Sequence, residues 1–480
     1  MTMIRNRLLS SAGACAAPIL LALAVSPSPA SAPLLVTTGA DTGEGSFRAA
    51  LETASRDTKT RPIFIVTGDD IDIQTTLAYS GRAPLEIYGN GQTVHARENV
   101  TLLEISEGAD LSVSKLHFKG PGGFSIENRG DEAGSGGKGI FLDVRDDQTG
   151  VVHMALENVS VSGVAYHGIH ISDCDLADAC GGGSGGGGDG APASINAQLT
   201  DVRIERVGLG AFDADGIRVD ERGDGDITFV SYNSVFRKVG ADGVELDEGD
   251  AGSVYASAVE NRFLDNGDYC DPRILHSYLP DEPDGEFDDG EKSEADLPAA
   301  VTGSPDDRCF EREISLHASG FVEEYEFSID LDDGIDIDEA GDGDLVVTMT
   351  DSEITGNLDE GVDLDEEDAG NAVISHVRSF ADHNTDDGFR TSESGPGDLT
   401  AVVYEVGAWK NGGNGLRFDE AGQGMVTVTI HRVTTAGNDD GNDTGIRVSR
   451  EGDGEGTLTV DQSDLRDGID ARNVEVVDVK

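Results

Sequence analysis

The sequence predicts an all-β solenoid in which short strands stack as successive coils. One observation is a motif, Asp-Gly-apolar-x-apolar-Asp-Glu, which spans residues 215–221, 242–248, 333–339 and, with Glu first, 360–366. A second is its spacing, because the glycines Gly334, Gly361, Gly388 and Gly415 follow one another every 27 residues. A third is the alternation of apolar and polar residues within each copy. A repeat of this length built from alternating segments is typical of a solenoid.

The alternation also predicts which side chains are buried. Ile217 and Val219 point one way along a strand, while Arg218 and Asp220 point the other way. We expect about three short strands per coil, about a dozen coils, and one buried row made of Ile217, Val244, Ile335, Val362, Leu416 and Ile446. Few segments have a helical period, which disfavours an all-helical solenoid. A nine-residue calcium-binding β-roll is also disfavoured, because Gly-Asp fragments such as 341–344 return only once per long repeat.

The N-terminus has the features of an export signal. Arg5 and Arg7 precede a mostly apolar stretch at 8–25, and small residues follow. Cleavage after Ala30 is favoured over cleavage after Ala32, because cleavage after Ala32 would leave Pro33 as the first mature residue, which disfavours processing. Residues 1–30 are therefore predicted to be a signal peptide, and the mature protein to be secreted or periplasmic. No later segment has the length needed to span a bilayer.

Residues 45–54 predict a short helix at the start of the mature chain. Ser46 is a suitable N-cap, and Phe47, Ala50, Leu51 and Ala54 form one apolar face. A solenoid needs its open apolar end covered, and this helix is placed to do so. The strand-like segment 34–38, this helix and the later turn at 87–91 together resemble secreted right-handed parallel β-helix proteins of the pectate-lyase-like class. The resemblance covers nearly all of the mature chain and implies a right-handed parallel β-helix, but it carries over no activity.

Breaks in the repeat predict the domain organisation. An N-terminal strand and capping helix (31–60) precede a first β-helix block (61–266), which holds a Gly-rich insertion at 174–190. An acidic insertion (267–329) separates it from a second block (330–480). Four cysteines remain after signal cleavage, and their proximity favours Cys174–Cys180 and Cys270–Cys309 disulfides that pin the two insertions. A Cys-only zinc site is the alternative, but paired CxxC spacings are missing.

The charge of the chain excludes some partners. The net charge is −59, and removal of residues 1–30 takes away two arginines and no acid, leaving −61. Nucleic acids and anionic membranes would be repelled by such a protein. Two explanations of the acidity stay open at this point: carboxylates that bind divalent cations, or a surface adapted to high salt.

Stacked repeats place acidic residues in rows about 4.8 Å apart. Two carboxylates at that distance repel by roughly 3–4 kcal/mol at an effective dielectric constant near 20, unless a cation lies between them. Ca²⁺ prefers such clustered oxygens. The predicted metal ligands are Asp336, Asp338, Asp363 and Asp365, with Asp220 and Asp247 at the equivalent position of the first block. A row of turn glutamates is added by Glu221, Glu248, Glu339, Glu366, Glu393 and Glu420. The alternative is that all these side chains extend into solvent and are screened there.

Basic residues continue the same rows. Arg390, Arg417 and Arg447 occupy the outward position two residues after the motif glycine. Carboxylates beside arginines on a β-helix resemble Ca²⁺-dependent polysaccharide lyases, which implies Arg390 or Arg417 as the base that abstracts a proton. The competing interpretation is a structural Asp363–Arg390 ion pair between coils. His167 and His170 are either a transition-metal pair or ordinary surface histidines.

These observations predict an exported, calcium-stabilised β-helix protein with a binding or structural role at glycans. The first alternative is a Ca²⁺-dependent lyase acting on an acidic polysaccharide, and the second is a surface adhesin. Whether the protein is an enzyme, and its oligomeric state, stay undetermined by the sequence.

Overall fold

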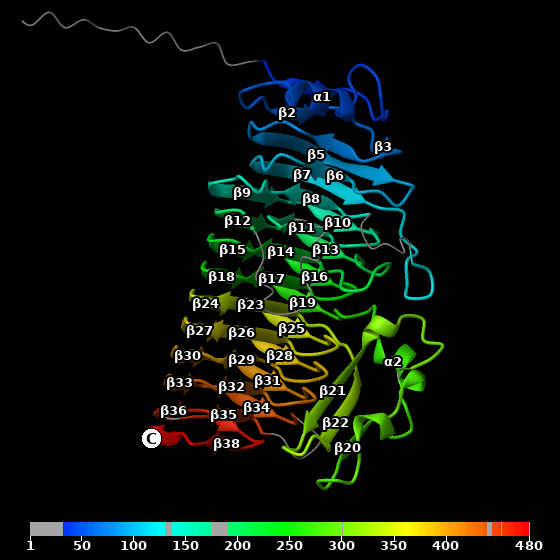
Figure 1. The fold of residues 1–480 in the computed structure, drawn as a ribbon. Helices are drawn as coiled ribbons and strands as arrows, with labels where there is room; N and C mark the ends of the chain where they lie inside the picture. The colour runs from blue at the N-terminus through cyan, green and yellow to red at the C-terminus, as the bar shows by residue number, and fades with distance from the viewer. Residues whose placement is uncertain are drawn as a thin grey trace, which may run out of the picture. The chain divides into compact units, whose positions relative to one another are not determined.

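Parallel strands stacked coil upon coil make up most of the described chain. The computed structural model describes residues 32–129, 137–174, 190–299, 301–438, 444–452 and 454–479. Helix α1 lies at the N-terminal end of the stack and β38 at the other end (Figure 1). The fold class predicted from the sequence, an all-β parallel β-helix with an N-terminal helix, is confirmed.

One side of the stack is a twelve-stranded parallel sheet, which matches the predicted dozen coils. The motif repeats form its central strands. In chain order its strands are β4 (Leu77–Tyr79), β6 (Leu103–Ile105), β8 (Ile140–Asp143), β11 (Ile169–Ser172), β14 (Ile217–Glu221), β17 (Val244–Glu248), β23 (Ile335–Gly341), β26 (Val362–Asp368), β29 (Arg390–Glu393), β32 (Leu416–Glu420), β35 (Ile446–Arg450) and β38 (Ile469–Arg472).

The other two sides belong to a 24-stranded sheet whose two columns join through the long strands β5 and β7. The left column of Figure 1 is β1 (Leu34–Val36), β2 (Ile63–Ile65), β5 (Leu85–Ala96), β7 (Leu111–Lys119), β9 (Gly150–Glu157), β12 (Ala193–Thr200), β15 (Ile227–Tyr232), β18 (Val254–Val259), β24 (Leu345–Thr350), β27 (Ala372–Val377), β30 (Leu399–Tyr404), β33 (Val426–His431), β36 (Gly456–Asp461) and β39 (Glu475–Val479). The right column is β3 (Ile71–Ile73), β10 (Ser160–Ser162), β13 (Arg203–Glu205), β16 (Val235–Arg237), β19 (Arg262–Leu264), β25 (Glu353–Thr355), β28 (Phe380–Asp382), β31 (Gly407–Trp409), β34 (Thr434–Ala436) and β37 (Asp464–Leu465).

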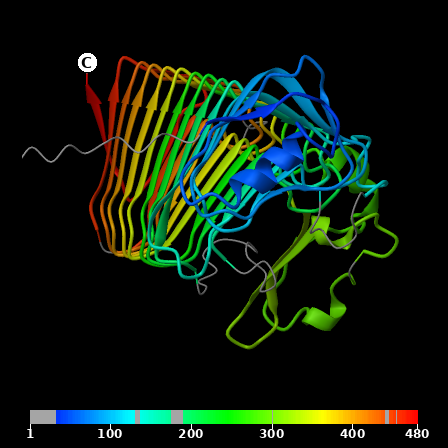
Figure 2. The ribbon, with the colours of Figure 1, turned by 90° about the horizontal axis from the view of Figure 1, so that it is seen from above.

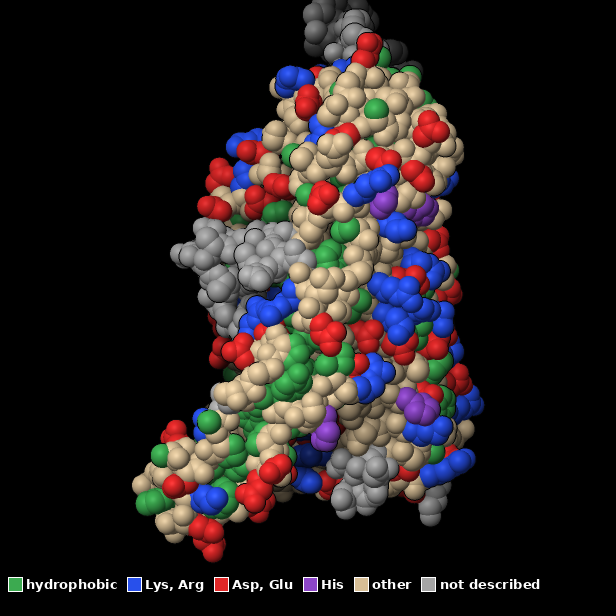
Figure 3. Space-filling view, turned by 90° about the vertical axis from the view of Figure 1, so that its right-hand side faces the viewer, with side chains coloured by type: hydrophobic (Ala, Val, Ile, Leu, Met, Phe, Trp, Pro, Cys, Tyr) green, Lys and Arg blue, Asp and Glu red, His purple; other side chains and the backbone are tan. Residues whose placement is uncertain are grey.

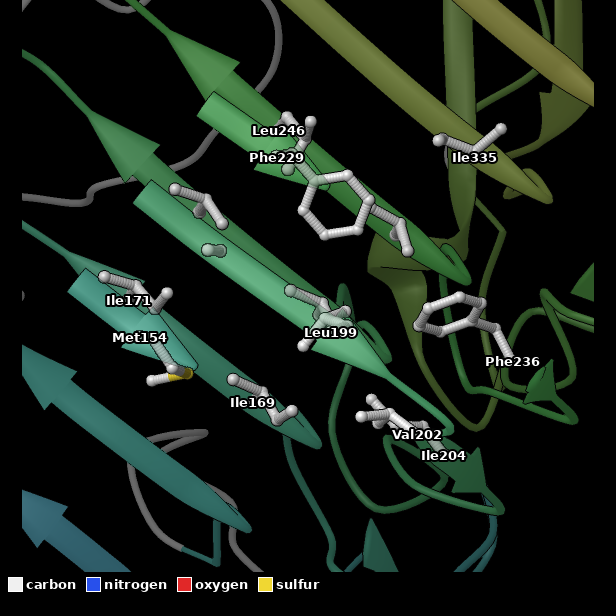
Figure 4. Packing of buried hydrophobic residues seen from close by; sticks show 14 of the residues in the cluster. Met154, Ile169, Ile171, Leu199, Val202, Ile204, Phe229, Phe236, Leu246 and Ile335 are labelled. Atoms are coloured by element: carbon white, nitrogen blue, oxygen red, sulfur yellow. The ribbon is translucent and has the colours of Figure 1, made fainter. Parts of the chain in front are cut away.

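The predicted inward row is confirmed. Ile217 lies opposite Val244, Ile335 opposite Val362, and Leu416 opposite Ile446, and all six are buried. Side chains from the three sides meet in one continuous apolar core, part of which is shown in Figure 4. Because side chains alternate along a strand, the residues between these positions point to the outside of the coil.

The motif glycine is required by the close approach of coils. A Cβ atom on Gly334 would lie 2.4 Å from the carbonyl oxygen of Gly361, and one on Gly216 would lie 2.3 Å from that of Gly243. No side chain fits at such distances. This explains why Gly recurs where the strands of the twelve-stranded sheet begin.

A buried asparagine ladder, which the sequence reasoning missed, ties the coils together at one turn. Asn357 donates from its backbone N and its Nδ2 to Oδ1 of Asn384, at 3.1 and 2.9 Å. Asn384 repeats both bonds to Asn411, and Asn411 to Asn438. The signal was present in the sequence, because these asparagines recur every 27 residues.

Helix α1 (Phe47–Ala54) forms as predicted. The Ser46 side chain accepts a hydrogen bond from the backbone N of Ala49 at 3.2 Å, and the four predicted apolar residues are its buried ones. In the part of the chain that the structure describes, no helix is long and apolar enough to cross a membrane.

The acidic insertion is folded. Strands β20 (Asp284–Glu286), β22 (Val322–Ile329) and β21 (Phe310–Leu316) form an antiparallel sheet, preceded by the short helix α2 (Pro272–Leu275). The predicted Cys270–Cys309 disulfide is confirmed and pins this segment. Seen from above, the insertion extends to one side of the coils (Figure 2). Cys180 lies outside the described residues, so the Cys174–Cys180 pairing stays a prediction.

Candidate functional site

An acidic pocket lies where the insertion returns to the twelve-stranded sheet. Its volume is about 460 Å³, and two apolar residues, Phe212 and Leu331, contribute to its wall. The other lining residues are all carboxylic acids: Asp213, Asp242, Glu245, Glu311, Asp330, Asp332, Asp336, Asp338, Asp363 and Asp365. The described lining therefore offers a concentration of oxygen ligands with no basic side chain among them.

Strand register places the predicted metal ligands in this pocket. Asp336 on β23 lies opposite Asp363 on β26, and Asp338 lies opposite Asp365. Strand β17 adds Glu245 beside Asp336. Besides Glu245, five acids of the lining were not among the predicted ligands. Strand β21 of the insertion carries Glu311, the chain leaving β22 carries Asp330 and Asp332, and the segments before β14 and β17 carry Asp213 and Asp242.

Burial makes the charge of this pocket costly. It raises the pKa of Asp336, Asp338 and Asp363 well above the ordinary value, and the neighbouring carboxylates raise each one further. The pKa of Asp330 rises to about 8 for the same reasons, with Glu311 as its hydrogen-bonded neighbour. A bound cation would remove this penalty, since an opposite charge nearby favours the ionised carboxylate.

One group of acids has the geometry of a cation site. Ligand atoms of Asp333, Glu360 and Asp363 all lie within 4.8 Å of one another. Asp333 is 7% exposed, and its Oδ1 has no hydrogen-bond partner. An orphaned buried carboxylate oxygen beside two others suits a hard divalent cation such as Ca²⁺. A second group is Asp213, Asp215 and Glu245, of which Asp213 and Glu245 line the pocket.

Asp220 and Asp247 differ from the other predicted ligands because they lie outside the pocket lining, where arginines and a histidine engage them. Asp220 accepts from Arg218 Nε at 2.7 Å and pairs with His170 Nε2 at 2.6 Å. These partners hold the pKa of Asp220 well below its ordinary value despite its burial. Asp247 is ion-paired with Arg222 and Arg218. The pocket lining includes neither of them.

The predicted arginine row exists, and its members contact acids. Arg390 lies opposite Arg417, and Arg417 opposite Arg447. Arg390 forms an ion pair with Asp363, and the charges of Asp363, Asp365 and Glu360 raise its pKa although burial lowers it. Arg417 pairs with Asp419. A general base must be unprotonated before it can accept a proton, whereas the neighbouring acids keep Arg390 protonated, so this geometry favours the ion-pair interpretation of Arg390.

The two histidines of the turn at 166–170 are buried, which corrects the expectation of surface histidines. His167 is 1% exposed and His170 is 3% exposed. His170 Nδ1 accepts from Lys138 Nζ at 2.5 Å, while its Nε2 faces Asp220. Both ring nitrogens are therefore occupied, which leaves none for a metal. Burial lowers the pKa of Lys138 to about 8, and sequence reasoning missed this lysine because it lies in an earlier coil.

The turn glutamates are also buried, whereas the sequence placed them on the outer acidic rows. Glu221, Glu248, Glu339, Glu366, Glu393 and Glu420 are each 0% exposed. Backbone N–H groups of the following glycines bond to several of them, such as Gly395 and Gly397 to Glu393. Burial and neighbouring glutamates raise the pKa of Glu366 to about 9. We call these six residues the glutamate ladder; it lies apart from the acidic pocket.

Comparison with known proteins adds no family. No family model matches this chain, and no curated protein matches it. Similar solved structures include Geobacillus virus E2 ORF18 (TM-score 0.40, 8% identity, 88% of this chain and 62% of that one). A second is the catalytic domain of a GH87 α-1,3-glucanase in complex with nigerose, with a TM-score of 0.38 and 13% identity over 93% of this chain and 68% of that one. A third is the periplasmic alginate epimerase AlgG, with a TM-score of 0.33 and 10% identity over 81% of this chain and 78% of that one. The chain spans about three fifths of the virus protein's length. At such low identity and TM-score these likenesses support no functional argument, and the β-helix assignment rests on the strand pairing itself.

Proposed function

We propose that this protein is an exported β-helix that binds Ca²⁺ in the acidic pocket and uses the bound ion to hold an anionic glycan. The observation that supports this proposal best is the lining of the pocket. It contains ten carboxylic acids and no basic residue. Asp333, Glu360 and Asp363 are the primary ligands: Asp363 lines the pocket, and Asp333 and Glu360 lie next to it, with ligand atoms within 4.8 Å of that of Asp363. Asp336, Asp338 and Asp365 of the pocket lining complete the negative field. The Cys270–Cys309 disulfide and the signal-like N-terminus support export.

The glycan part of the proposal is supported by what lies beside the pocket. The arginine row Arg390, Arg417 and Arg447 continues from Asp363 along the same outer face, one residue per coil. Their side chains are 24–29% exposed. Guanidinium groups recognise carboxylates, and a bound Ca²⁺ would bridge a further carboxylate to the acidic wall. A chain of uronate residues has carboxylates to match such a row.

Calorimetric titration with CaCl₂ at fixed ionic strength tests the cation site. We expect saturable binding to the mature protein and its loss in the double variant Asp333→Asn, Asp363→Asn. The matched control is Asp281→Asn with Asp288→Asn, two exposed acids of the insertion. Equal heats from MgCl₂, NaCl and CaCl₂, or equal loss in the control, would mean that the acidity only adapts the surface to salt.

Binding of uronate oligosaccharides tests the glycan part separately. We expect affinity only with Ca²⁺ present, and weakening in Arg417→Gln with Arg447→Gln, whose cation binding should stay intact. Calcium binding without any glycan binding would confine the function to calcium-dependent stability.

A polysaccharide lyase is the second candidate, and it is favoured by the hydrogen-bonded series Lys138–His170–Asp220. Lysine with a pKa of about 8 is a better base than an ion-paired arginine. Arg218 connects this hydrogen-bonded series to the pocket, because Arg218 contacts both Asp220 and Glu245. Ultraviolet absorbance from an unsaturated product, abolished in Lys138→Met and retained in Arg390→Lys, would establish this activity; loss in Arg390→Lys alone would restore Arg390 as the base.

A further inference from the structure

One face of the protein is free of charge although the chain is strongly acidic. Charged residues make up 26% of the sequence, yet β12, β15, β18, β24, β27, β30 and β33 of the left column contain no Asp, Glu, Lys or Arg. Their outward positions hold Ser, Thr, Asn, Gln, Val and Tyr, and His431 at one margin. We call the outer surface of these seven strands the neutral face.

The neutral face also exposes large apolar side chains. Val230, Tyr232, Tyr255, Val373 and Val402 are 39–47% exposed. The strands pair in unbroken register from β12 to β33, so these side chains lie on one continuous sheet surface rather than on separate loops.

The other sides of the coil differ from the neutral face. The twelve-stranded sheet carries the acidic pocket, and the right column carries charged pairs such as Arg262 with Glu353 at 2.7 Å. Figure 3 views the right-hand side, where acidic and basic side chains lie close together. Ion pairs also follow one margin of the neutral face, Arg378 with Asp351 and Arg432 with Glu405. The opposite margin carries Asp226, Asp344 and Asp398, which accept hydrogen bonds from the backbone N of Ser253, Asn371 and Met425 on the next coil. An uncharged centre with a charged rim is the arrangement of a protein interface.

We propose that two copies of this chain pack against each other through the neutral face, as a two-fold symmetric dimer. In such a dimer each surface patch meets the same patch of its partner. An acidic patch would then face an acidic patch, and copies with a net charge of −59 repel one another over most of their surface. The neutral face brings no carboxylates of its seven strands together, which makes it suited to a second copy.

The size of the neutral face is sufficient for a stable dimer. Seven strands spaced about 4.8 Å apart, with about six residues rising 3.3 Å each, cover roughly 34 Å by 20 Å, or about 700 Å² per copy. Two copies would bury about 1,400 Å², within the range of roughly 1,200–2,000 Å² for specific protein interfaces. Sheets packed in this way stack about 10 Å apart, with their outward side chains interdigitated.

The arrangement of the aromatic residues argues against a sugar-stacking surface. Tyr404 stacks on His431 of the next coil with ring centroids 5.1 Å apart, but Val377 lies opposite Tyr404 on the other side. Tyr255 lies opposite Thr228 and Val346, and Tyr232 lies opposite Thr200 and Val259, so the described rings of this face do not form a continuous row. An alternative to the dimer is that the face is uncharged only because valine and threonine have high strand propensity, which would favour them here in a monomer as well. The oligomeric state decides between these explanations.

The oligomeric state can be measured by sedimentation equilibrium of the mature protein over a range of protein and salt concentrations. We expect a dimer that strengthens as salt screens the repulsion between copies. Val373→Glu with Val402→Glu should weaken it by roughly a hundredfold or more, because it sets like charges face to face. The matched control, Ile274→Glu with Leu316→Glu, places the same charges on exposed apolar sites of the insertion and should leave the dimer unchanged.

Two further measurements keep the outcome decisive. Thermal unfolding shows whether each variant is folded. Cross-linking with a short bis-maleimide should yield a covalent dimer for Thr348→Cys, which lies at the centre of the neutral face, but not for Leu316→Cys. A protein that sediments as a monomer at every concentration overturns the proposal. So does a dimer that both double variants affect equally.

Discussion

Asp336 on β23 lies directly opposite Asp363 on β26, and both side chains line the same acidic pocket. They are 27 residues apart in the chain, and the parallel register of two coils makes them neighbours. Burial raises the pKa of both; Asp363 is among the carboxylates that raise the pKa of Asp336 further, and Asp365 and Glu360 raise that of Asp363. A fold that stacks acids in this way depends on protons or cations to relieve their repulsion.

Calcium should stabilise the protein more than sodium does at matched ionic strength. A ligand that binds only the folded state adds RT ln(1 + [L]/Kd), about 2.7 kcal/mol at a hundredfold excess over Kd. Thermal unfolding with and without millimolar Ca²⁺ measures this gain, which Asp363→Asn with Asp365→Asn should reduce. If sodium chloride stabilises as well as calcium, no specific site exists.

The glutamate ladder should make the protein more stable in mild acid than in mild base. Burial raises the pKa of Glu248 to about 7, of Glu339 to about 8 and of Glu366 to about 9. A raised folded-state pKa contributes stability that is complete below the unfolded-state pKa near 4.5 and is lost as the pH rises through the folded value. The free energy of unfolding, measured in EDTA, should therefore fall between pH 5 and 9.

The size of this fall should be about 1.4 kcal/mol per pH unit for each extra proton that the folded state holds. Glu366→Gln should flatten it, while Asp281→Asn, at an exposed acid, should not change it. A stability that rises across the same pH range would show that the ladder is ionised.

Reduction of Cys270–Cys309 should loosen the insertion and weaken calcium binding together. The bond closes a loop with a sequence separation of 39 residues, for which the chain-entropy estimate is roughly 4 kcal/mol. Because the insertion supplies Glu311, Asp330 and Asp332 to the pocket, Cys270→Ser with Cys309→Ser should lower the calcium affinity. Limited proteolysis and calorimetry measure the two effects, and unchanged affinity would remove the insertion from the site.

Non-reducing peptide mapping checks the pairing itself. Bridged Cys270–Cys309 and Cys174–Cys180 peptides are expected, and crossed pairing would contradict both disulfides.

The asparagine ladder should contribute measurably to stability. Asn384→Ala leaves two donors of Asn357 without their acceptor, which costs roughly 1–3 kcal/mol per buried group. Asn371→Ala, an exposed asparagine that also bonds to a neighbouring coil, is the control and should cost less. Urea unfolding measures both, and equal losses would mean that burial of the ladder is unimportant.

The sequence by itself determined the coil and its inner face. Gly334 and Gly361 set the period, and the alternation around Ile335 and Ile337 shows which side chains turn inward, because both signals arise from neighbouring residues on one strand. The same alternation brought Asp336, Asp338, Asp363 and Asp365 together correctly.

Only the tertiary structure decided how far each outward side chain is from water. Arg218 and Asp220 occupy outward positions of β14, yet they are 3% and 0% exposed and pair with Glu245 and His170 of adjacent coils. Lys138 reaches His170 from an earlier coil, and Asp330 reaches the pocket from the insertion. Such contacts depend on the path of turns and insertions between coils, which no repeat encodes, so they arise only when the whole chain is packed.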